Sequence, residues 1–393
     1  MNNKKRVTLA SFLAYFIMSG MLAPMGIISG PMAEYFAQPV TVITAKFGWL
    51  TFGILIGAIV ALLIFDLVRL RNVLIGVYAT ILACLLTLTL PVSISFIGPP
   101  LGLVGACCGI GLAAAALVIS RTYDDERRAS MLVITDGSFS VAGIVCSWVA
   151  VLLVVRGVHW AGVYQFVAII SLLVVLLSLA SEFPEAEASG NVPGDHGGWP
   201  VAVWLCIASL FLYTLGQWAF LLWLPNHAET LLGAARESAG QIVSQYWTGM
   251  FATQVFVSWW VLRIGVRRLV LLVGVSTTLF SVPLWLLTDV DSLIVISAVW
   301  GFMNLGLLKI VLSFATQMLR VPTGRLVSSL LLGATVGTAV SPWVTSQIVA
   351  ATNTRFVMQF GTGCFALLTI FLFAAARADT SSRRNPAQFK AKT

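Results

Sequence analysis

Long apolar runs separated by short polar segments repeat along almost the whole chain. A run of about 18 or more apolar residues is long enough to cross a lipid bilayer as a helix. The pattern predicts twelve such spans, at residues 9–32, 41–65, 72–92, 96–119, 130–154, 161–181, 200–225, 239–262, 269–288, 292–318, 326–350 and 356–376. The predicted fold class is therefore an all-α membrane protein with twelve transmembrane helices.

A polar segment divides the predicted spans into two sets of six. Residues 182–199, EFPEAEASGNVPGDHGGW, are rich in glycine, proline and acidic residues, a composition typical of a linker. We therefore expect four parts, namely an N-terminal six-helix half at 1–181, a cytoplasmic linker at 182–199, a C-terminal six-helix half at 200–376 and a cytoplasmic basic tail at 377–393.

The overall composition agrees with a membrane protein. Hydrophobic residues make up 59% of the chain and charged residues 10%, whereas a soluble domain carries about 25% charged residues. The N-terminal MNNKKRVTLASF resembles the start of a signal peptide, but the apolar stretch after it is too long and is followed by further spans. We interpret that stretch as a retained first helix.

The basic residues predict the orientation of the chain. Most of the 23 Lys and Arg residues fall at the N-terminus, in the tail and in the loops on one side of the predicted topology, and only Arg156, Arg236 and Arg355 fall in loops on the other. Because cytoplasmic loops are enriched in Lys and Arg, both termini are predicted to be cytoplasmic. We expect a multi-pass protein of the cell inner (cytoplasmic) membrane. The predicted topology explains the net charge of +8. We therefore expect the lipid bilayer to be a partner and expect no nucleic-acid partner.

The sequence lacks the usual equipment of enzymes. The six cysteines lie within apolar stretches without zinc-ligand or disulfide-framework spacing, the three histidines belong to no HExxH motif, and no Walker-type glycine loop is present. We therefore expect no metal, no cofactor and no enzymatic activity.

The two halves carry traces of an internal repeat. The stretch from Gly143 to Trp148 matches the stretch from Gly337 to Trp343, and Gly105 and Gly111 correspond to Gly301 and Gly306. Weak internal symmetry of this kind is typical of transporter folds built from repeats.

A single acid, Asp136, stands in the otherwise apolar or small run MLVITDGSFSVAGIVCSW. Counted from Arg128, it lies roughly 12 Å along the predicted helix, close to the middle of the membrane. Ser140 shares its helix face, together with Gly143 and Ser147. An ionisable group at this depth indicates a functional site. The alternative is a helix-packing face on which Thr135 or Ser138 caps the acid.

Lys309 is the matching cation in the second half. Counted back from Arg320, it lies roughly 16 Å inward, a depth comparable to that of Asp136. We hypothesise that Asp136 and Lys309 pair across a central cavity, or that either alone forms the switchable polar centre. The alternative is a lysine whose long stem reaches toward the cytoplasmic face.

Other polar residues in the predicted spans are weaker candidates for the solute or ion pathway. Besides Ser140, they are Gln217, Gln245, Asn304 and Lys46. The amides are equally suited to joining helices, and Lys46 lies near an outer end, where its amine reaches water easily.

Two six-helix halves, a central linker and cytoplasmic termini resemble the major facilitator superfamily. The loop signature of that superfamily, Gly-x-x-x-Asp-Arg-x-Gly-Arg-Arg, survives after the second span only as Asp66 and Arg71. After the eighth span more of it remains, with Arg263 and Arg267. The resemblance implies a gating role for these four residues.

A closer resemblance is to the TsgA-type proteins, which are related to the fucose and glucose proton symporters. It rests on the run from Thr135 to Gly143 and on Glu182-Phe183-Pro184. The sugar permeases carry Gln-x-Phe-Asn-x-x-Gly at the same place, with amides that face the sugar. Here Gly137 and Ser140 replace those amides, so the resemblance implies neither sugar specificity nor proton coupling.

We therefore expect a monomeric secondary active transporter that moves a small-molecule solute by alternating access, with protons as the candidate coupling ion. The alternative is a membrane sensor or scaffold that kept the transporter fold without transporting.

Overall fold

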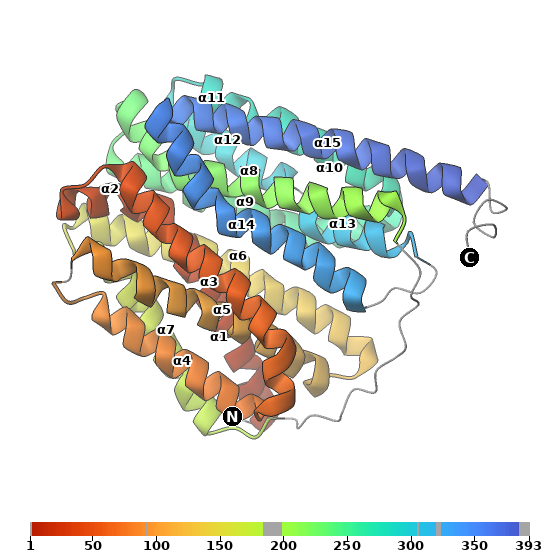
Figure 1. Cartoon of the computed structure of the whole chain (residues 1–393), viewed down its shortest axis with the longest axis horizontal. Helices are drawn as coiled ribbons and strands as arrows, with labels where there is room; N and C mark the ends of the chain where they lie inside the picture. Colours follow the sequence, from red (N-terminus) through yellow and green to blue (C-terminus); the bar gives the residue numbers. More distant parts are fainter. Residues whose placement is uncertain (1, 92, 184–198, 305, 320–323, 385–393) are drawn as a thin grey trace.

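The computed structural model describes residues 2–91, 93–183, 199–304, 306–319 and 324–384. Every regular element in this part of the chain is an α-helix (Figure 1). The first seven are α1 (Asn3–Leu22), α2 (Met25–Phe36), α3 (Val40–Leu67), α4 (Leu70–Thr87), α5 (Ile94–Thr122), α6 (Asp125–Val155) and α7 (Gly162–Leu179). The others are α8 (Val201–Leu231), α9 (Arg236–Ile264), α10 (Val266–Ser281), α11 (Pro283–Leu286), α12 (Val290–Met303), α13 (Leu307–Thr316), α14 (Gly324–Ala351) and α15 (Thr354–Arg384).

Each of the twelve predicted spans coincides with one of these helices or with two successive ones. By length and composition, 10 helical spans in the described residues are suited to cross a membrane, or up to 11 when the bent pair α1 and α2 is counted as one span. The predicted span at 239–262 lies in α9, outside that set. This helix carries Gln241, Gln245 and Gln254 and packs against α6, α8 and α12, so protein surrounds much of it.

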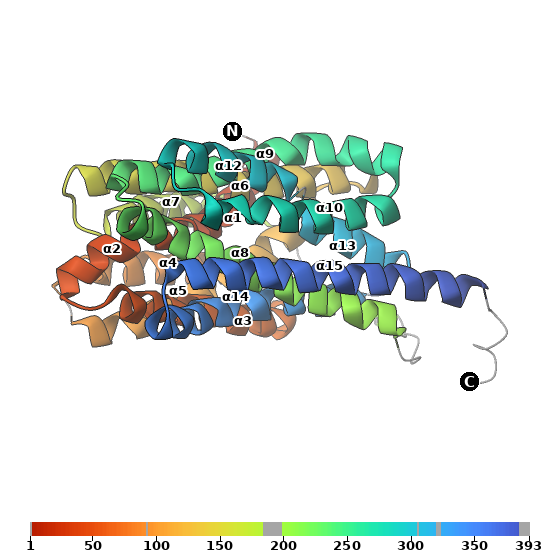
Figure 2. The ribbon, with the colours of Figure 1, turned by 90° about the horizontal axis from the view of Figure 1, so that it is seen from above.

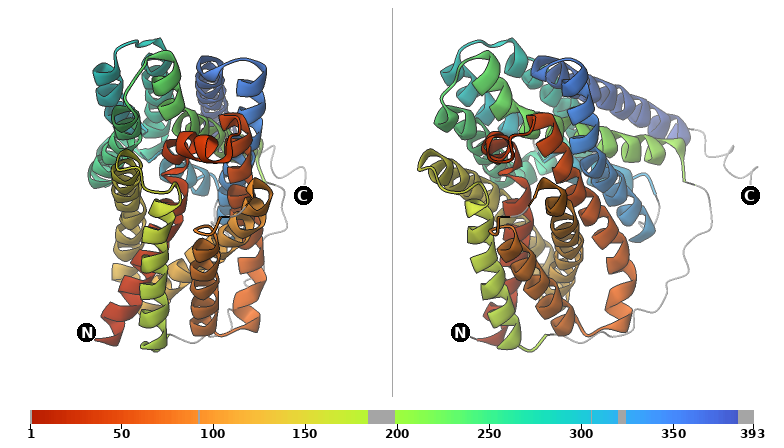
Figure 3. Two further views of the ribbon diagram at one scale, coloured as in Figure 1. Left: turned by 90° about the vertical axis from the view of Figure 1, so that its left-hand side faces the viewer. Right: turned by 60° about the vertical axis from the view of Figure 1, so that its left-hand side comes forward.

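The helices form two groups, α1–α7 and α8–α15, which pack mainly within themselves. Figure 1 and the right-hand view of Figure 3 show the groups meeting near α2 and spreading apart toward the opposite end. Contacts between the groups run along α3 and α14, α6 and α9, and α2 and α8. In Figure 2, α8 passes across α15, and it packs against α15, α14 and α9. Most of the predicted linker, residues 184–198, lies outside the described residues.

Glycines allow the closest helix contacts within each group. A Cβ atom on Gly105 of α5 would lie 2.0 Å from the Leu50 carbonyl oxygen of α3, and one on Gly301 of α12 would lie 2.1 Å from the Tyr246 carbonyl oxygen of α9. Only glycine permits backbones to approach so closely. Gly105 and Gly301 correspond in the predicted repeat, and they play the same packing role in their two groups.

Two of the predicted spans are interrupted. The axes of α1 and α2 differ by 48°, with Pro24 preceding α2. Between α12 and α13 the chain turns at Gly306, which has a φ of +62°. Nearby carbonyls are capped by side chains, because Thr253 donates to the Phe302 oxygen and Ser276 donates to the Met303 oxygen at 2.9 Å. Such compensation makes a break tolerable inside a membrane. Hydropathy alone did not predict either interruption.

The glycine contacts predict the effect of a single added methyl group. Gly301→Ala should lower the stability by about 1–3 kcal/mol, because the added methyl group would overlap the backbone of α9 at Tyr246. The control is Gly363→Ala in α15, where a Cβ meets nothing within 4 Å and where the change should be neutral or stabilising by about 0.4–1 kcal/mol. Apparent melting temperatures in detergent measure the difference. Equal temperatures for the two variants would contradict the packing account.

Candidate solute and gating site

Asp136 of α6 and Lys309 of α13 form an ion pair between Oδ2 and Nζ. The partners come from different helix groups, and their side chains are 36% and 34% exposed, respectively. Lys309 is in the first turn of α13, directly after the break at Gly306. The pair is therefore a charged contact between the two groups that remains partly accessible.

The neighbouring hydroxyls of α6 are bonded elsewhere. Thr135 donates to the Met131 carbonyl oxygen at 2.6 Å, and Ser138 donates to the Phe12 carbonyl oxygen of α1 at 3.0 Å. The alternative in which these hydroxyls cap Asp136 is therefore not the arrangement found. The Lys309 ammonium likewise contacts Asp136.

Beyond the ion pair, along α6 toward its C-terminal end, α6 and α9 pack tightly. Gln254 Nε2 donates to Ser140 Oγ at 2.9 Å. One turn further along α6, a Cβ on Gly143 would lie 2.4 Å from the Trp247 ring, and that ring lies 5.7 Å from the ring of Phe139. The polar face of α6 is thus packed against α9 at Ser140 and Gly143, whereas its charged residue Asp136 is partly exposed.

Sequence reasoning missed Gln254 as a site residue. Its only signal was an amide in an apolar stretch, which it shares with several other glutamines. Tyr15 of α1 was also missed, although it lies close enough to Asp136 for the two groups to interact electrostatically. Both residues are far from Asp136 in sequence, so only the fold brings them together.

Gln217 and Asn304 belong to a separate polar cluster inside the C-terminal group. Gln217 donates to the Tyr246 hydroxyl at 2.5 Å, and Asn304 donates to the same oxygen at 3.2 Å. All three residues are buried. Among the described residues no hydrogen bond joins this cluster to Asp136 or Lys309. In the state described here it holds α8, α9 and the break after α12 together.

The remaining two pathway candidates are not brought to the ion pair. Gln245 of α9 and Lys46 of α3 are both half-buried. In the part of the chain that the structure describes, neither makes a hydrogen bond or an ion pair with Asp136 or Lys309. Their assignment to the pathway stays a prediction.

Two of the four predicted gating residues bind within their own helix groups. Arg71, next to the start of α4, donates to the Ser178 and Leu179 carbonyl oxygens of α7 at 3.2 and 2.6 Å. Arg267, next to the start of α10, donates to the Ala376 carbonyl oxygen of α15 at 2.8 Å. Each arginine thus holds the last long helix of its group.

The other two predicted gating residues are Arg263 and Asp66. Arg263 is exposed near the end of α9, and the side chain of Asp66 lies outside the described residues. A gating role for the four residues stays a prediction, and in this state the contacts of Arg71 and Arg267 brace individual groups.

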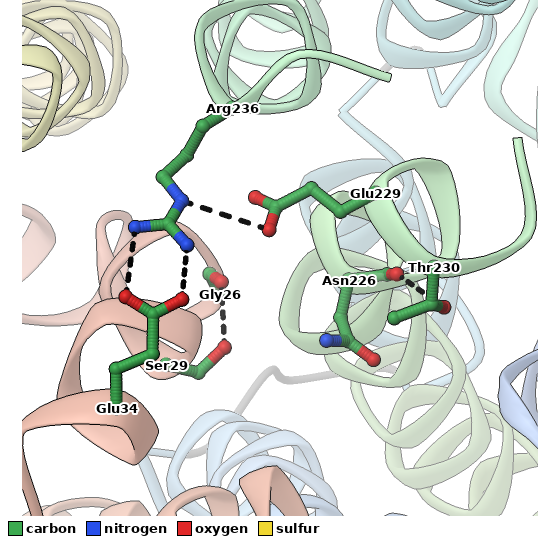
Figure 4. Close-up of polar contacts among 7 residues, drawn as sticks. All are labelled: Gly26, Ser29, Glu34, Asn226, Glu229, Thr230 and Arg236. Carbon is green, nitrogen blue, oxygen red and sulfur yellow. Dashed lines mark hydrogen bonds and ion pairs between the residues drawn. The ribbon is translucent and has the colours of Figure 1, made fainter. Parts of the chain in front are cut away.

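An ionic network joins the two groups near α2, at the end that the sequence predicts to be the outer one (Figure 4). The Arg236 guanidinium donates to both carboxylate oxygens of Glu34 and lies 3.8 Å from Glu229 Oε2. Glu34 comes from α2, whereas Arg236 and Glu229 come from α9 and α8. The hydrogen bond to Glu34 raises the pKa of Arg236 above its ordinary value. Sequence reasoning placed Arg236 on the outer side and did not predict that it pairs with Glu34.

Next to this network, the backbones of α2 and α8 are also in close contact. A Cβ on Gly26 of α2 would lie 2.2 Å from the Leu221 carbonyl oxygen of α8. A pocket of about 220 Å³ lies beside the network and includes Glu34, Tyr35, His159, Trp160 and Arg236 in its lining. We call Glu34, Arg236 and Glu229 the outer network.

Comparisons with known proteins show which family and which relatives the chain is similar to. A family model of the Major Facilitator Superfamily matches residues 206–393. The chain is 26% identical over 389 residues to Protein TsgA of Salmonella arizonae and 25% identical over 384 residues to Protein TsgA of Shigella flexneri, and each comparison covers 95% of both chains.

Two solved structures share the fold. The chain is similar to the nucleoside transporter NupG, with a TM-score of 0.76 and 13% identity over 95% of this chain and 100% of that one. It is also similar to a bacterial homolog of the human lysosomal transporter Spinster, solved in an inward-facing and unoccupied conformation. That TM-score is 0.71, with 14% identity over 97% of this chain and 98% of the other.

Fold and site together define a multi-pass helical membrane protein in which two helix groups meet around a pair of opposite charges. The chain is similar to the major facilitator superfamily over its C-terminal half and to TsgA proteins over nearly its whole length.

The ion pair predicts the outcome of a charge exchange. Asp136→Lys places two cations together and Lys309→Asp two anions, whereas the double variant restores opposite charges. Removing one partner costs about 3–5 kcal/mol in a buried pair and about 0.2–1 kcal/mol in an exposed one. For this partly exposed pair we expect each single variant to lose about 1–3 kcal/mol, and the double variant to regain at least half. Apparent melting temperatures measure this.

The controls for the exchange are Asp291→Lys and Arg156→Asp, which change charge by the same amount at exposed positions. They should have little effect. A double variant as unstable as the sum of the two singles would show that Asp136 and Lys309 do not pair.

The outer network predicts that Arg236→Gln opens the outer end, because Glu34 and Glu229 then face each other without a cation. The probe is Ser29→Cys, on a buried position of α2, in a chain whose six native cysteines are replaced. Labelling from outside with a membrane-impermeant maleimide should accelerate severalfold in Arg236→Gln. Salt should also accelerate it when Arg236 is present, because exposed ion pairs are screened. Arg156→Gln is the control. An unchanged labelling rate in Arg236→Gln would show that the outer network does not keep this end closed.

Proposed function

We propose that the protein is a secondary transporter that moves a small solute across the cell inner membrane by alternating access, with both termini in the cytoplasm. The observation that carries the proposal is the Asp136–Lys309 ion pair. Charged groups inside a membrane are costly and mark substrate or ion pathways. A partly exposed pair made by both helix groups is suited to break and re-form as the groups move.

The contacts between the groups support a state closed on the outer side. The outer network joins α2 to α8 and α9, and the packed contact of α6 and α9 continues inward as far as Gln254 and Ser140. A solute from the cytoplasmic side would then meet Asp136 and Lys309 where this packing ends. The similar Spinster homolog was solved in an inward-facing conformation, which agrees with this interpretation.

Alternating access then requires both contacts to open in turn. Entry from outside requires that Arg236 release Glu34 and that α6 and α9 separate at Gly143 and Trp247. Since Asp136 and Lys309 belong to different groups, their contact changes in the same movement. The Asp136 carboxylate is the group at this contact that can also accept a proton, so protons are the coupling ion that we propose. The proposed unit is a monomer.

The proposal predicts a bound solute that depends on Asp136. Thermal stability of the purified protein should be measured at two pH values across sugars, sugar acids, amino acids, oxyanions and drugs. A solute at about 100 times its dissociation constant adds roughly 2.7 kcal/mol to the folded state. We expect this gain to vanish in Asp136→Asn and to persist in the control Asp291→Asn.

The sensor or scaffold alternative makes the opposite prediction. A panel that stays flat in detergent and again in lipid would contradict the transporter proposal. The same holds for a solute that binds equally well to Asp136→Asn and Lys309→Gln and shows no exchange across reconstituted membranes.

A further inference from the structure

The polar centre offers a solute one positive and one negative charge side by side. Asp136 and Lys309 are each about one-third exposed, so a solute that enters between the helix groups reaches both. Because the charges of the pair cancel, the centre as a whole has no preference for an anion over a cation.

The hydroxyl groups of α6 next to the pair already have partners. Ser140 accepts the amide of Gln254, and Thr135 and Ser138 donate to main-chain oxygens. A neutral solute that binds only through hydroxyl groups would therefore have to compete with existing hydrogen bonds and would leave the ion pair intact.

A singly charged solute meets a different cost. An anion that binds Lys309 separates it from Asp136 and leaves a carboxylate without a counter-charge, and a cation on Asp136 leaves an ammonium in the same position. Uncompensated charge at this depth is strongly unfavourable. A solute that carries both charges replaces both partners at once, so neither group is left alone.

We propose that the solute is a small zwitterion, with an ammonium group that binds Asp136 and a carboxylate that binds Lys309. An α-amino acid is the simplest example. This inference rests on the proposed transport function and names its substrate class. When the solute binds, the Asp136–Lys309 ion pair is replaced by one ion pair between the solute and each residue. Binding is thereby coupled to movement, because the solute takes over the contact between α6 and α13.

The test compares a zwitterion with its singly charged derivatives on the native full-length chain in lipid nanodiscs. Each of the twenty L-amino acids is screened by thermal stability, with glucose and lactate as the neutral and anionic references. For each amino acid that stabilises the protein, the N-acetyl form removes the cation and the methyl ester removes the anion. We expect each derivative to bind at least tenfold more weakly than its parent.

Site variants provide the second measurement. Asp136→Asn and Lys309→Gln should each weaken zwitterion binding at least tenfold, whereas the controls Asp291→Asn and Arg156→Gln should not. The derivative comparison uses the native chain, so it decides the matter even where a site variant fails to fold.

The outcomes separate this inference from the function beneath it. A derivative that binds as tightly as its parent, or an Asp136-dependent response to glucose or lactate only, overturns the zwitterion assignment and leaves a transporter with a different solute. A chain that binds nothing in any class and exchanges no solute in proteoliposomes contradicts the transport function as well.

Discussion

A charge in the interior of a membrane protein needs a partner, and this constraint organises the centre of the molecule. Asp136 and Lys309 satisfy it only because two helix groups bring α6 and α13 together. Neither residue can be buried in its own group at low cost, so the pair makes the arrangement of the two groups matter energetically. The break before α13 helps to position Lys309, because it places this residue in the first turn of a new helix. Thr253 and Ser276 donate hydrogen bonds to carbonyl oxygens just before the break.

The two groups are built with the same devices, and this explains why they can move as units. Gly105 and Gly301 let a helix of each group approach its neighbour within backbone contact. Arg71 and Arg267 each bind carbonyls of the last long helix in their own group. These contacts stiffen each group internally. The contacts between the groups combine packed helix pairs, namely α3 with α14, α6 with α9 and α2 with α8, with an outer ionic network and one partly exposed ion pair. Ionic contacts can exchange partners without unpacking a core.

Much of the fold follows from hydropathy, because an apolar run long enough to span a bilayer has few alternatives to a helix. The twelve predicted spans accordingly coincide with helices, while the bends at Pro24 and Gly306 depend on local backbone and packing that hydropathy does not record. Counting residues from flanking arginines placed Asp136 and Lys309 at similar depths. It could not show that they touch, since that depends on how α6 and α13 face each other. Gln254 and the pairing of Glu34 with Arg236 were missed for the same reason, because each joins positions more than 100 residues apart.

The central claim is that the Asp136–Lys309 pair stabilises the state in which the outer ends are closed. Spin labels at Arg156→Cys and Ala351→Cys, at the outer ends of α6 and α14, report the separation of the two groups when the native cysteines are replaced. Pulsed electron paramagnetic resonance should give one short distance between the two labels in the otherwise native chain. A second, longer population should appear in Asp136→Asn and in Lys309→Gln. Identical distance distributions in all three proteins would contradict the claim.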